Sequence, residues 1–447
     1  MGHVLRWSAL FVVAGAAAWL LARFWRVTAI GAAYKAKVLA STIFGTGRTI
    51  DAGRADEVRA DSYRALRLFR AHVDPGSRSV TVSFLGLRPR TAIYRAGLGA
   101  TLAPPGGLAR QSDILLPPAS APPWPEGGGS AELRRVVESA FSEPDPGRLR
   151  RTRAVVVVHD GRIVAERYAP GFTASTRLPG WSMTKSVLGA LIGILVADGR
   201  LSLQDRELLP QWRAPDPRAE IRLEDLLRMR SGLRFSEAYS DLSSDVIEML
   251  FNRPDTATYA ADQPLSVAPG TAWSYSSGTT NILSGLIRRA VGEADYLGWP
   301  RRVLFDPIGM NSAFIEPDAS GTYVGSSFML ATVRDWARFG QLYLQDGLWD
   351  GQRIVPEEWV RFCTSPTPQS PGGIYGAHWW LKLKPELGGE TAAAARIPPD
   401  AFFAVGHEGQ TLTVVPSLRL VVVRLGLSIY LDAWNHAAFL ADVQETF

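Results

Sequence analysis

Short strand-like runs of apolar residues lie at both ends of the region from residue 131 to the C-terminus. Residues 154–158 and 163–168 flank an Asp-Gly pair, which is a strong hairpin signal. Three further runs come near the end of the chain, at residues 402–405, 411–415 and 418–424. The stretch between them reads mostly as helices and loops. This order predicts an α/β (α+β) fold, in which an antiparallel sheet built from both ends is flanked by helices and interrupted by a helical subdomain.

Helical patterns fill the rest of this region. They cover residues 131–141, 224–229, 279–290 and 434–447. The most apolar helix follows Ser182, because residues 186–196 are apolar almost all round. A helix of that kind lies in a core and not on a surface, so we expect it to run behind the sheet.

The first 30 residues predict a membrane segment. Trp7 to Ala22 is an uncharged run of 16 residues between Arg6 and Arg23. No clear A-x-A cleavage site follows, which favours an uncleaved anchor over a cleaved signal segment or a buried soluble helix. The basic residues after the run argue for a cytoplasmic C-terminal side. A signal anchor argues the reverse, and we expect the main domain to be periplasmic or otherwise extracytoplasmic. Secretion after cleavage and a cytoplasmic orientation are the alternatives.

Residues 31–130 predict an N-terminal extension and a linker. Residues 53–72 have helical periodicity, and Val80, Val82 and Phe84 alternate like a short strand. Residues 103–130 are rich in Pro and Gly and carry no periodicity, which is typical of a linker. The main domain is therefore expected at residues 131–447.

Composition narrows the class of protein. The chain has 447 residues, 46% of them hydrophobic, with 14 Trp, which suits a globular core. Its net charge of +5 is spread without a dense basic block, so no nucleic-acid partner is expected. The single cysteine, Cys363, excludes an intrachain disulfide and ends an amphipathic helix, which argues against a catalytic role. There is no H-E-x-x-H motif and no phosphate loop, and no metal or cofactor is expected.

The first candidate for chemistry is Ser182-Met183-Thr184-Lys185. Residues at i and i+3 share one helix face, so the hydroxyl and the amine can touch. An unprotonated lysine can remove the proton of a serine, and burial lowers the pKa of a lysine toward neutrality. The alternative is a helix start with an exposed lysine.

Two further motifs follow along the chain. Tyr275-Ser276-Ser277 precedes a helix, and a phenol beside a lysine ammonium can be held partly as phenolate and act as a base. Ser277 could relay a proton. The alternative for Tyr275 is a core tyrosine.

The last motif, residues 406–410, precedes a strand and contains His407, Gly409 and Gln410. Gly409 lets the backbone approach a ligand closely, and the Gln410 amide could point at a substrate carbonyl. The alternative for His407 is an ordinary loop histidine.

The order Ser182-x-x-Lys185, Tyr275-x-Ser277, His407-x-Gly409 resembles the serine β-lactamase and penicillin-binding protein family. It is most similar to the class C β-lactamase-related branch, which includes esterases and 6-aminohexanoate-dimer hydrolases. The resemblance covers roughly residues 131–447. It implies a β-lactamase/transpeptidase-like fold and a serine hydrolase that forms an acyl-enzyme.

The resemblance also implies roles. Ser182 matches the acylated nucleophile, Lys185 the lysine that shares its proton, and Tyr275 the base of the second motif. The backbone amides of Ser182 and Gln410 match the oxyanion hole.

Two departures from the family pattern bear on the substrate. His407 stands where many members have lysine, and Ser277 where many have asparagine. A histidine with a pKa near ~6.5 is mostly neutral at pH 7. Both departures argue against an efficient β-lactamase and favour an ester, a simple amide or a peptide-like small molecule.

Three aromatic residues are candidates for the walls of the site. Tyr239 is in a plausible position on a loop over the cleft, with a surface-loop tyrosine as an equal alternative. Trp181 and Trp379 could line the pocket, although core packing is the favoured interpretation for each. A membrane-bound peptide or cell-wall binding module with little or no turnover is the second hypothesis for function. A structural membrane protein is the third. No pattern indicates an oligomeric state.

Overall fold

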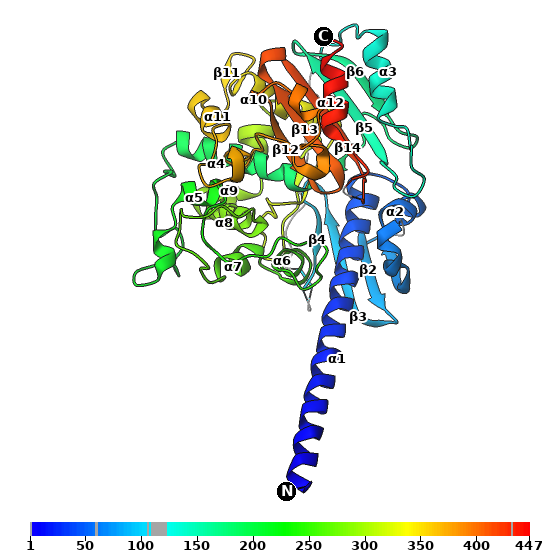
Figure 1. Ribbon diagram of the computed structural model, residues 1–447, viewed down its shortest axis with the longest axis vertical. Helices are drawn as coiled ribbons and strands as arrows, with labels where there is room; N and C mark the ends of the chain where they lie inside the picture. Colours follow the sequence, from blue (N-terminus) through cyan, green and yellow to red (C-terminus); the bar gives the residue numbers. More distant parts are fainter. Residues whose placement is uncertain (1, 59–60, 105–106, 109–122, 431) are drawn as a thin grey trace.

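The computed structural model describes residues 2–58, 61–104, 107–108, 123–430 and 432–447 (Figure 1). Its centre is a five-stranded antiparallel sheet in the order β12-β13-β14-β5-β6. Two strands come from the start of the main domain, β5 (Thr152–His159) and β6 (Arg162–Tyr168), and three from its end, β12 (Phe402–Gly406), β13 (Gln410–Val415) and β14 (Leu420–Gly426). β5 pairs with β14, with Val156 opposite Val423. The prediction of a sheet assembled from both ends is confirmed.

This sheet is buried on both faces. Alternate residues of a strand point to opposite faces, and those of β5 belong to two separate apolar clusters. Val155 and Val157 share a cluster with residues of α3 (Ala131–Ser139) and α12 (His436–Gln444), whereas Val156 shares one with α10 (Val333–Leu344). The main domain is therefore a sheet between two helical layers, as Figure 1 shows.

The serine helix does not lie where the sequence suggested. It consists of the 3-10 turn η3 (Trp181–Met183) and α4 (Thr184–Ala197). α4 meets the sheet chiefly at its edge strand β12 and packs against α8 (Ser277–Val291), whereas α10 covers the sheet. A Cβ on Gly340 of α10 would lie 2.7 Å from side-chain atoms of Leu412 and Val421, so α10 approaches the sheet closely. α4 is apolar all round because protein encloses it on every side.

The helical insertion lies between β6 and β12. Its helices, besides α4, α8 and α10, are α5 (Leu223–Leu227), α6 (Asp245–Asn252), α7 (Thr256–Ala261), α9 (Glu293–Tyr296) and α11 (Glu357–Cys363). It also holds a small sheet of β7 (Leu178–Pro179), β9 (Met329–Ala331) and β8 (Phe314–Ile315), and the hairpin β10 (Leu348–Trp349) and β11 (Gln352–Arg353). The helices expected at residues 131–141, 224–229, 279–290 and 434–447 correspond to α3, α5, α8 and α12.

The N-terminal extension forms a second, four-stranded sheet beside the main domain. After α2 (Ile50–Glu57) and the 3-10 segment η2 (Asp61–Leu68) come β1 (Phe69–Asp74), β2 (Ser79–Phe84), β3 (Leu87–Arg95) and β4 (Gly99–Leu102). The strand expected at Val80 to Phe84 is confirmed. The helix expected over residues 53–72 is wrong in its second half, because Phe69 pairs with Phe84 and packs on α1 at Gly31. Part of the Pro/Gly-rich stretch 103–130 lies outside the described residues.

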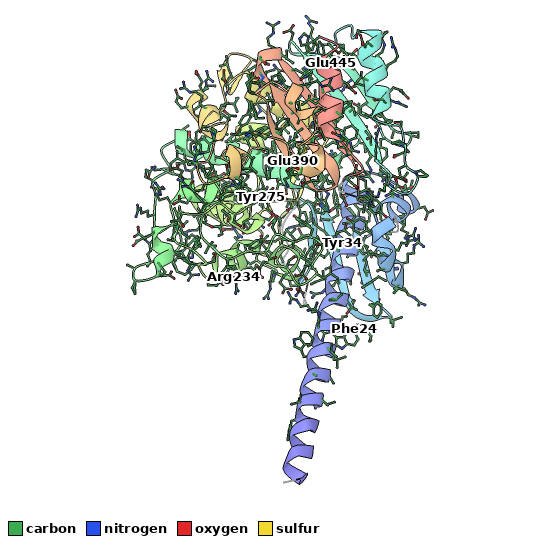
Figure 2. All side chains as sticks on the ribbon, in the orientation of Figure 1. Phe24, Tyr34, Arg234, Tyr275, Glu390 and Glu445 are labelled. Atoms are coloured by element: carbon green, nitrogen blue, oxygen red, sulfur yellow. The ribbon has the colours of Figure 1, made fainter. Side chains whose placement is uncertain are left out.

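One long helix, α1 (Gly2–Ala40), protrudes from the folded body and continues into the N-terminal extension. Residues 11–24 are exposed and protrude as a rod, whereas Ala29 is buried (Figures 1 and 2). Farther along, Lys37 donates hydrogen bonds to the Ala100 carbonyl and to the Glu316 carboxylate of the main domain. The stretch Phe11–Gly45 is long and apolar enough to cross a membrane by length and composition.

Candidate active site

Ser182 lies in a tight turn that is clamped against β12. The residue before it, Trp181, has a φ of 48°, in the left-handed region that bulky residues rarely adopt. The Met183 amide donates to the Gly180 carbonyl at 3.1 Å. A Cβ on Gly406 of β12 would stand 2.2 Å from that same carbonyl oxygen, so only glycine fits there. The fold therefore brings the last motif against the first.

Lys185 is buried directly behind Ser182. It is 1% exposed, and its Nζ donates to the Ser182 Oγ at 2.9 Å, the Ser277 Oγ at 3.0 Å and the Ser326 carbonyl at 2.9 Å. Burial lowers the pKa of Lys185 to about 8, with Glu237 opposing the shift and Lys384 adding to it. About a tenth of this amine is thus neutral at pH 7, against far less for an ordinary lysine, and the neutral form is the one that can act as a base for a serine hydroxyl.

Tyr275 lies on the other side of the same amine. The Lys185 Nζ is 4.9 Å from the centre of the Tyr275 ring. Burial raises the pKa of Tyr275 well above its usual value, and its hydrogen bond with Ser182 offsets only part of that rise. The phenol is therefore protonated at neutral pH, and the expected partial phenolate is wrong for the free protein. This favours Lys185 as the first proton acceptor.

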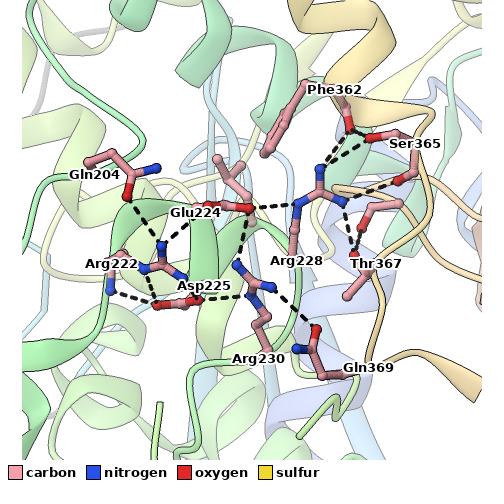
Figure 3. Close-up of polar contacts among 12 residues, drawn as sticks. Gln204, Arg222, Glu224, Asp225, Arg228, Arg230, Phe362, Ser365, Thr367 and Gln369 are labelled. Atoms are coloured by element: carbon pink, nitrogen blue, oxygen red, sulfur yellow. Dashed lines mark hydrogen bonds and ion pairs between the residues drawn. The ribbon is translucent and has the colours of Figure 1, made fainter. Parts of the chain in front are cut away.

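A network of ion pairs surrounds α5, close in sequence to a contact with the segment that carries Tyr275, and Figure 3 shows the network. Around α5, Arg228 and Arg230 pair with Glu224, and Arg230 also pairs with Asp225. The next residues hold the Tyr275 segment, because the Met229 carbonyl accepts a hydrogen bond from the Ser274 amide at 2.8 Å. The ion pairs thus hold the residues on both sides of Met229, which in turn is hydrogen-bonded to the residue before Tyr275.

Ser277 joins the lysine to a carboxylate that the sequence analysis did not single out. Its side chain is fully buried, and its Oγ donates to the Glu237 Oε1 at 2.5 Å. The Ser277 amide donates to the other oxygen of Glu237 at 2.8 Å. Lys185, Ser277 and Glu237 thus form a continuous hydrogen-bonded chain leading away from the Ser182 hydroxyl. The only sequence signal was an acidic residue two positions before Tyr239.

The loop before α6 brings Tyr239 over the serine. Its ring stacks on His407 with centroids 4.8 Å apart and planes at 15°. Burial raises its pKa, while hydrogen bonds with Ser277, Ser327 and Ser182 act in the opposite direction. The structure therefore brings Tyr239 to the Ser182 hydroxyl, although nearly 60 residues separate them.

His407 lies between two aromatic rings and is not a cation. Besides Tyr239, it meets Trp181 edge-on with centroids 5.4 Å apart. Burial lowers the pKa of His407 to about 4, and the positive charge of Lys384 adds to the shift. The ordinary histidine pKa near ~6.5 assumed from the sequence is therefore wrong here.

A second lysine in this part of the site is Lys384, which the sequence analysis missed and whose Nζ lies 3.7 Å from a carboxylate oxygen of Glu386. Its Nζ lies 5.2 Å from the ring centre of Tyr275 and 4.5 Å from that of Trp380. Burial lowers its pKa, while Glu386 and Glu237 act in the opposite direction. A usable signal existed, because the chain has only five lysines among its 48 basic residues and Lys185 is another of them.

Gln410 and Gly409 contact strand β14, and these contacts were not expected from the sequence. The Gln410 side chain exchanges two 2.8 Å hydrogen bonds with the backbone of Gly426, so it does not aim at a substrate carbonyl. Its backbone amide stays a candidate for the oxyanion hole, with that of Ser182. Gly409 has a φ of 80°, and a Cβ there would meet the Arg424 guanidinium at 2.7 Å. The glycine accommodates this arginine and not a ligand.

The two tryptophans differ. Trp181 is 7% exposed and donates its Nε1 to the Glu408 carboxylate at 3.1 Å. Trp379 is fully buried, stacked on Phe339 of α10 at 5.9 Å and edge-on to Phe402 of β12 at 5.0 Å. Its expected place in the pocket wall is wrong, because its ring fills the space between α10 and the sheet.

Nothing among the described residues suggests a metal centre, since no group of three His, Cys, Asp or Glu side chains there could hold an ion. Two surface hollows, of about 590 and 350 Å³, lie elsewhere, beside residues 265–269 and beside α3.

Known proteins resemble this chain in sequence and fold. The chain matches the family described as Beta-lactamase over residues 138–426. It is 25% identical over 299 residues to the 6-aminohexanoate-dimer hydrolase of Paenarthrobacter ureafaciens, covering 61% of this chain and 72% of that protein. A family VIII carboxylesterase superposes with a TM-score of 0.53 at 18% identity, over 72% of this chain and 99% of the other. A penicillin-binding protein homologue from Caulobacter crescentus gives 0.54 at 16% identity, with the same coverage. The β-lactamase/transpeptidase-like fold is confirmed, and the chain belongs to the β-lactamase family.

Proposed function

We propose that this protein is a serine hydrolase that cleaves an ester or amide bond through an acyl-enzyme on Ser182. The observation that carries the proposal is the 2.9 Å contact between the Lys185 Nζ and the Ser182 Oγ, together with a lysine pKa of about 8. Family membership supports it. So does the relative named for hydrolysis of the 6-aminohexanoate dimer, and a structural neighbour is a carboxylesterase.

The proposed first step is acylation. The Lys185 amine takes the Ser182 proton as Oγ attacks the carbonyl carbon, and the carbonyl oxygen becomes an oxyanion held by the amides of Ser182 and Gln410. When the intermediate collapses, the bond to the leaving group breaks. The Tyr275 phenol, kept protonated by burial, is suited to pass a proton to that group and to recover one from Lys185.

In the proposed deacylation, Lys185 accepts a proton again, this time from water. Water attacks the acyl carbon and gives a proton to the neutral Lys185 amine, and the Ser182 Oγ leaves and takes that proton back. The acid product departs with the water's oxygen. Ser277 and Glu237 hold the amine in place throughout, because Ser277 accepts from Lys185 and donates to Glu237.

The substrate we propose is a small ester, amide or peptide-like molecule, not a β-lactam. Tyr239, Ser277 and a neutral His407 would surround the acyl group. Lys384 lies beside the Tyr275 ring and Glu237 is hydrogen-bonded to Ser277, so ionisable groups of both signs adjoin the site and the leaving group or acyl chain can itself be charged.

We also propose a domain organisation and a cellular location for the chain. Residues 1–30 anchor it in a membrane, residues 31–130 form an extension and linker, and residues 131–447 form the hydrolase domain on the extracytoplasmic side. The exposed rod at residues 11–24 supports an anchor. Residues from Ala29 onward are packed into the body, so they belong to the folded protein whatever becomes of the preceding segment.

A fluorophosphonate probe tests the nucleophile. We expect wild type and the control Ser240→Ala, at an exposed loop position, to be labelled and Ser182→Ala to stay unlabelled. Equal labelling of all three proteins would refute the proposal. A panel of p-nitrophenyl esters, short linear amides, D-amino-acid peptides and a chromogenic cephalosporin then identifies the bond. A persistent adduct on Ser182 without turnover would instead indicate a binding module.

A further inference from the structure

Three exposed leucines gather at one end of the N-terminal sheet. Leu68, Leu85 and Leu87 are 65%, 74% and 51% exposed. Phe69 pairs with Phe84, and Phe84 pairs with Leu87, so the three leucines lie side by side at the same end of β1, β2 and β3. We call them the leucine rim. Their clustering distinguishes them from the single exposed apolar residues found on any protein surface.

The turn that carries Leu85, one of the three rim leucines, has a backbone conformation that is unfavourable for leucine. Leu85 and Gly86 form the two-residue loop between β2 and β3, and both have positive φ, 50° and 80°. Loops of this kind favour Asn, Asp or Gly at the first position, because other side chains are strained there. A large apolar side chain thus stands exposed at a site where local structure would prefer a polar one. Packing within the body does not account for it.

The rim lies level with the point where α1 leaves the body. The Phe24 and Phe84 rings are 5.7 Å apart, and the Arg88 guanidinium is 5.6 Å from the Trp25 ring centre. Phe24 and Trp25 follow the end of the uncharged run at Ala22 by two and three residues, or about 3 to 5 Å along a helix. Figure 2 labels Phe24 at this exit, and Figure 1 places the β2–β3 hairpin beside it.

The charge of this surface is positive. Residues 63–70 and 79–95 contain basic residues and no acidic one. Arg23 and Arg88 are exposed here, next to the rim. Nearby acidic groups on α6 and the loop before it are Glu248, which pairs with Arg26, and Asp241, which interacts with Arg23 and Arg26. Apolar tips among basic residues suit a bilayer surface with anionic headgroups.

We propose that the leucine rim inserts into the headgroup region of the same bilayer that holds α1, and so gives the hydrolase domain a second membrane contact. One helix alone lets a domain rotate and tilt, whereas a helix plus a sheet edge fixes the face turned to the lipid. The proposal rests on the anchor in the proposed function, and it is independent of the chemistry at Ser182. The occupant is lipid, and a second copy of the chain is an outcome that the test can detect.

Spin labels on the full-length protein test this directly. The chain has one cysteine, Cys363, and it is fully buried, so an introduced cysteine is the reactive one. Leu85→Cys places a label on the rim. Ser77→Cys, exposed in the turn at the opposite end of β1 and β2, is the matched control. Both proteins are placed in nanodiscs of phosphatidylcholine with and without phosphatidylglycerol.

In discs we expect the label at position 85 to collide several-fold less with a water-soluble nickel complex, and more with oxygen, than the label at position 77. The contrast should strengthen with phosphatidylglycerol and vanish in a protein solution without lipid or detergent. Equal exposure of the two labels in disc-bound protein would overturn the proposal, and so would failure to enter discs. Spin–spin broadening at position 85 would assign the rim to a second copy and also overturn it. An inactive but disc-bound protein with protected position 85 would contradict the hydrolase and support the rim.

Discussion

The phenol of Tyr63 donates a 2.7 Å hydrogen bond to the carboxylate of Glu408, so the N-terminal extension reaches the last motif of the candidate site. The same carboxylate accepts the Trp181 indole N–H, and Trp181 immediately precedes Ser182. On its other side the Tyr63 ring packs 5.5 Å from that of Tyr34 in α1. Contacts therefore run without a break from α1 to the residue before the proposed nucleophile.

Replacement of Tyr63 by Phe should weaken catalysis from a distance. Glu408 is 4% exposed, and an unsatisfied hydrogen bond on a buried group costs about 1–3 kcal/mol. We expect kcat for a p-nitrophenyl ester to fall roughly 3- to 30-fold with little change in KM, since the turn at Trp181 loses support but no substrate contact is removed. Tyr430→Phe is the control, because the Tyr430 ring lies 5.7 Å from the guanidinium of the exposed Arg148, and it should leave both constants unchanged. An unaltered kcat in folded Tyr63→Phe would separate the extension from the site.

Lys185→Arg should abolish most activity. A guanidinium cannot lose its proton at accessible pH, so the first step has no acceptor. We expect kcat/KM to fall by roughly 10²–10⁴-fold, close to the loss in Ser182→Ala. Ester hydrolysis at saturating and limiting substrate gives both constants. Retained activity would remove Lys185 from the proton path.

The pH dependence of kcat/KM should follow the deprotonation of the Lys185 amine. Because the pKa of Lys185 is about 8, the neutral form grows as pH rises, and kcat/KM should increase up to about pH 8 and then level off. Glu237 raises this pKa, so Glu237→Gln should move the rise to lower pH. A pH profile of the two proteins on a neutral ester measures both effects. A rise in Glu237→Gln at the same or higher pH would contradict the arrangement.

Lys384, and not His407, should select anionic substrates. Lys384→Met should raise KM for an ester carrying a carboxylate by roughly 3- to 10-fold relative to a neutral ester. The ratio of the two KM values cancels any effect on the proton path. Lys382→Met is the matched control, two residues away and exposed, with its ammonium on the Gly372 carbonyl. An unchanged ratio in Lys384→Met would remove this lysine from substrate selection.

The protonation of His407 should have no effect on KM at physiological pH. Burial holds its pKa at about 4, so it carries no charge between pH 5 and 8. We expect KM for an acidic ester to show no inflection near pH 6.5 that is lost in His407→Gln. Such an inflection, present in wild type and absent from the variant, would show that the histidine is more accessible to water than its contacts with Trp181 and Tyr239 suggest.

Local patterns predicted the parts of the fold that depend on neighbours in the chain. The Asp-Gly hairpin of β5 and β6, the three late strands and the Ser182–Lys185 pair all depend on spacings of a few residues. Glu237 could not be found in that way, because its contact with Ser277 spans 40 residues. The contact of Tyr63 with Glu408 spans 345 residues.

The surroundings of the aromatic side chains also could not be predicted from the sequence. Trp379 and Trp181 look equivalent in sequence and both are buried, but only the packed structure shows that Trp379 lies between α10 and the sheet whereas Trp181 lies beside His407. Likewise, no periodicity distinguishes a histidine enclosed by Trp181 and Tyr239 from one open to water, so the shift in its pKa could be read only from the packed structure.

α1 continues as one helix from its protruding end to Lys37 in the interior, with no flexible tether in between. A domain joined in this way cannot reorient independently of α1. For the anchored chain, encounters with substrate are then governed by lateral diffusion in a plane and by the local concentration above it. Compounds that partition to that surface would be hydrolysed ahead of equally reactive ones that remain in bulk solution.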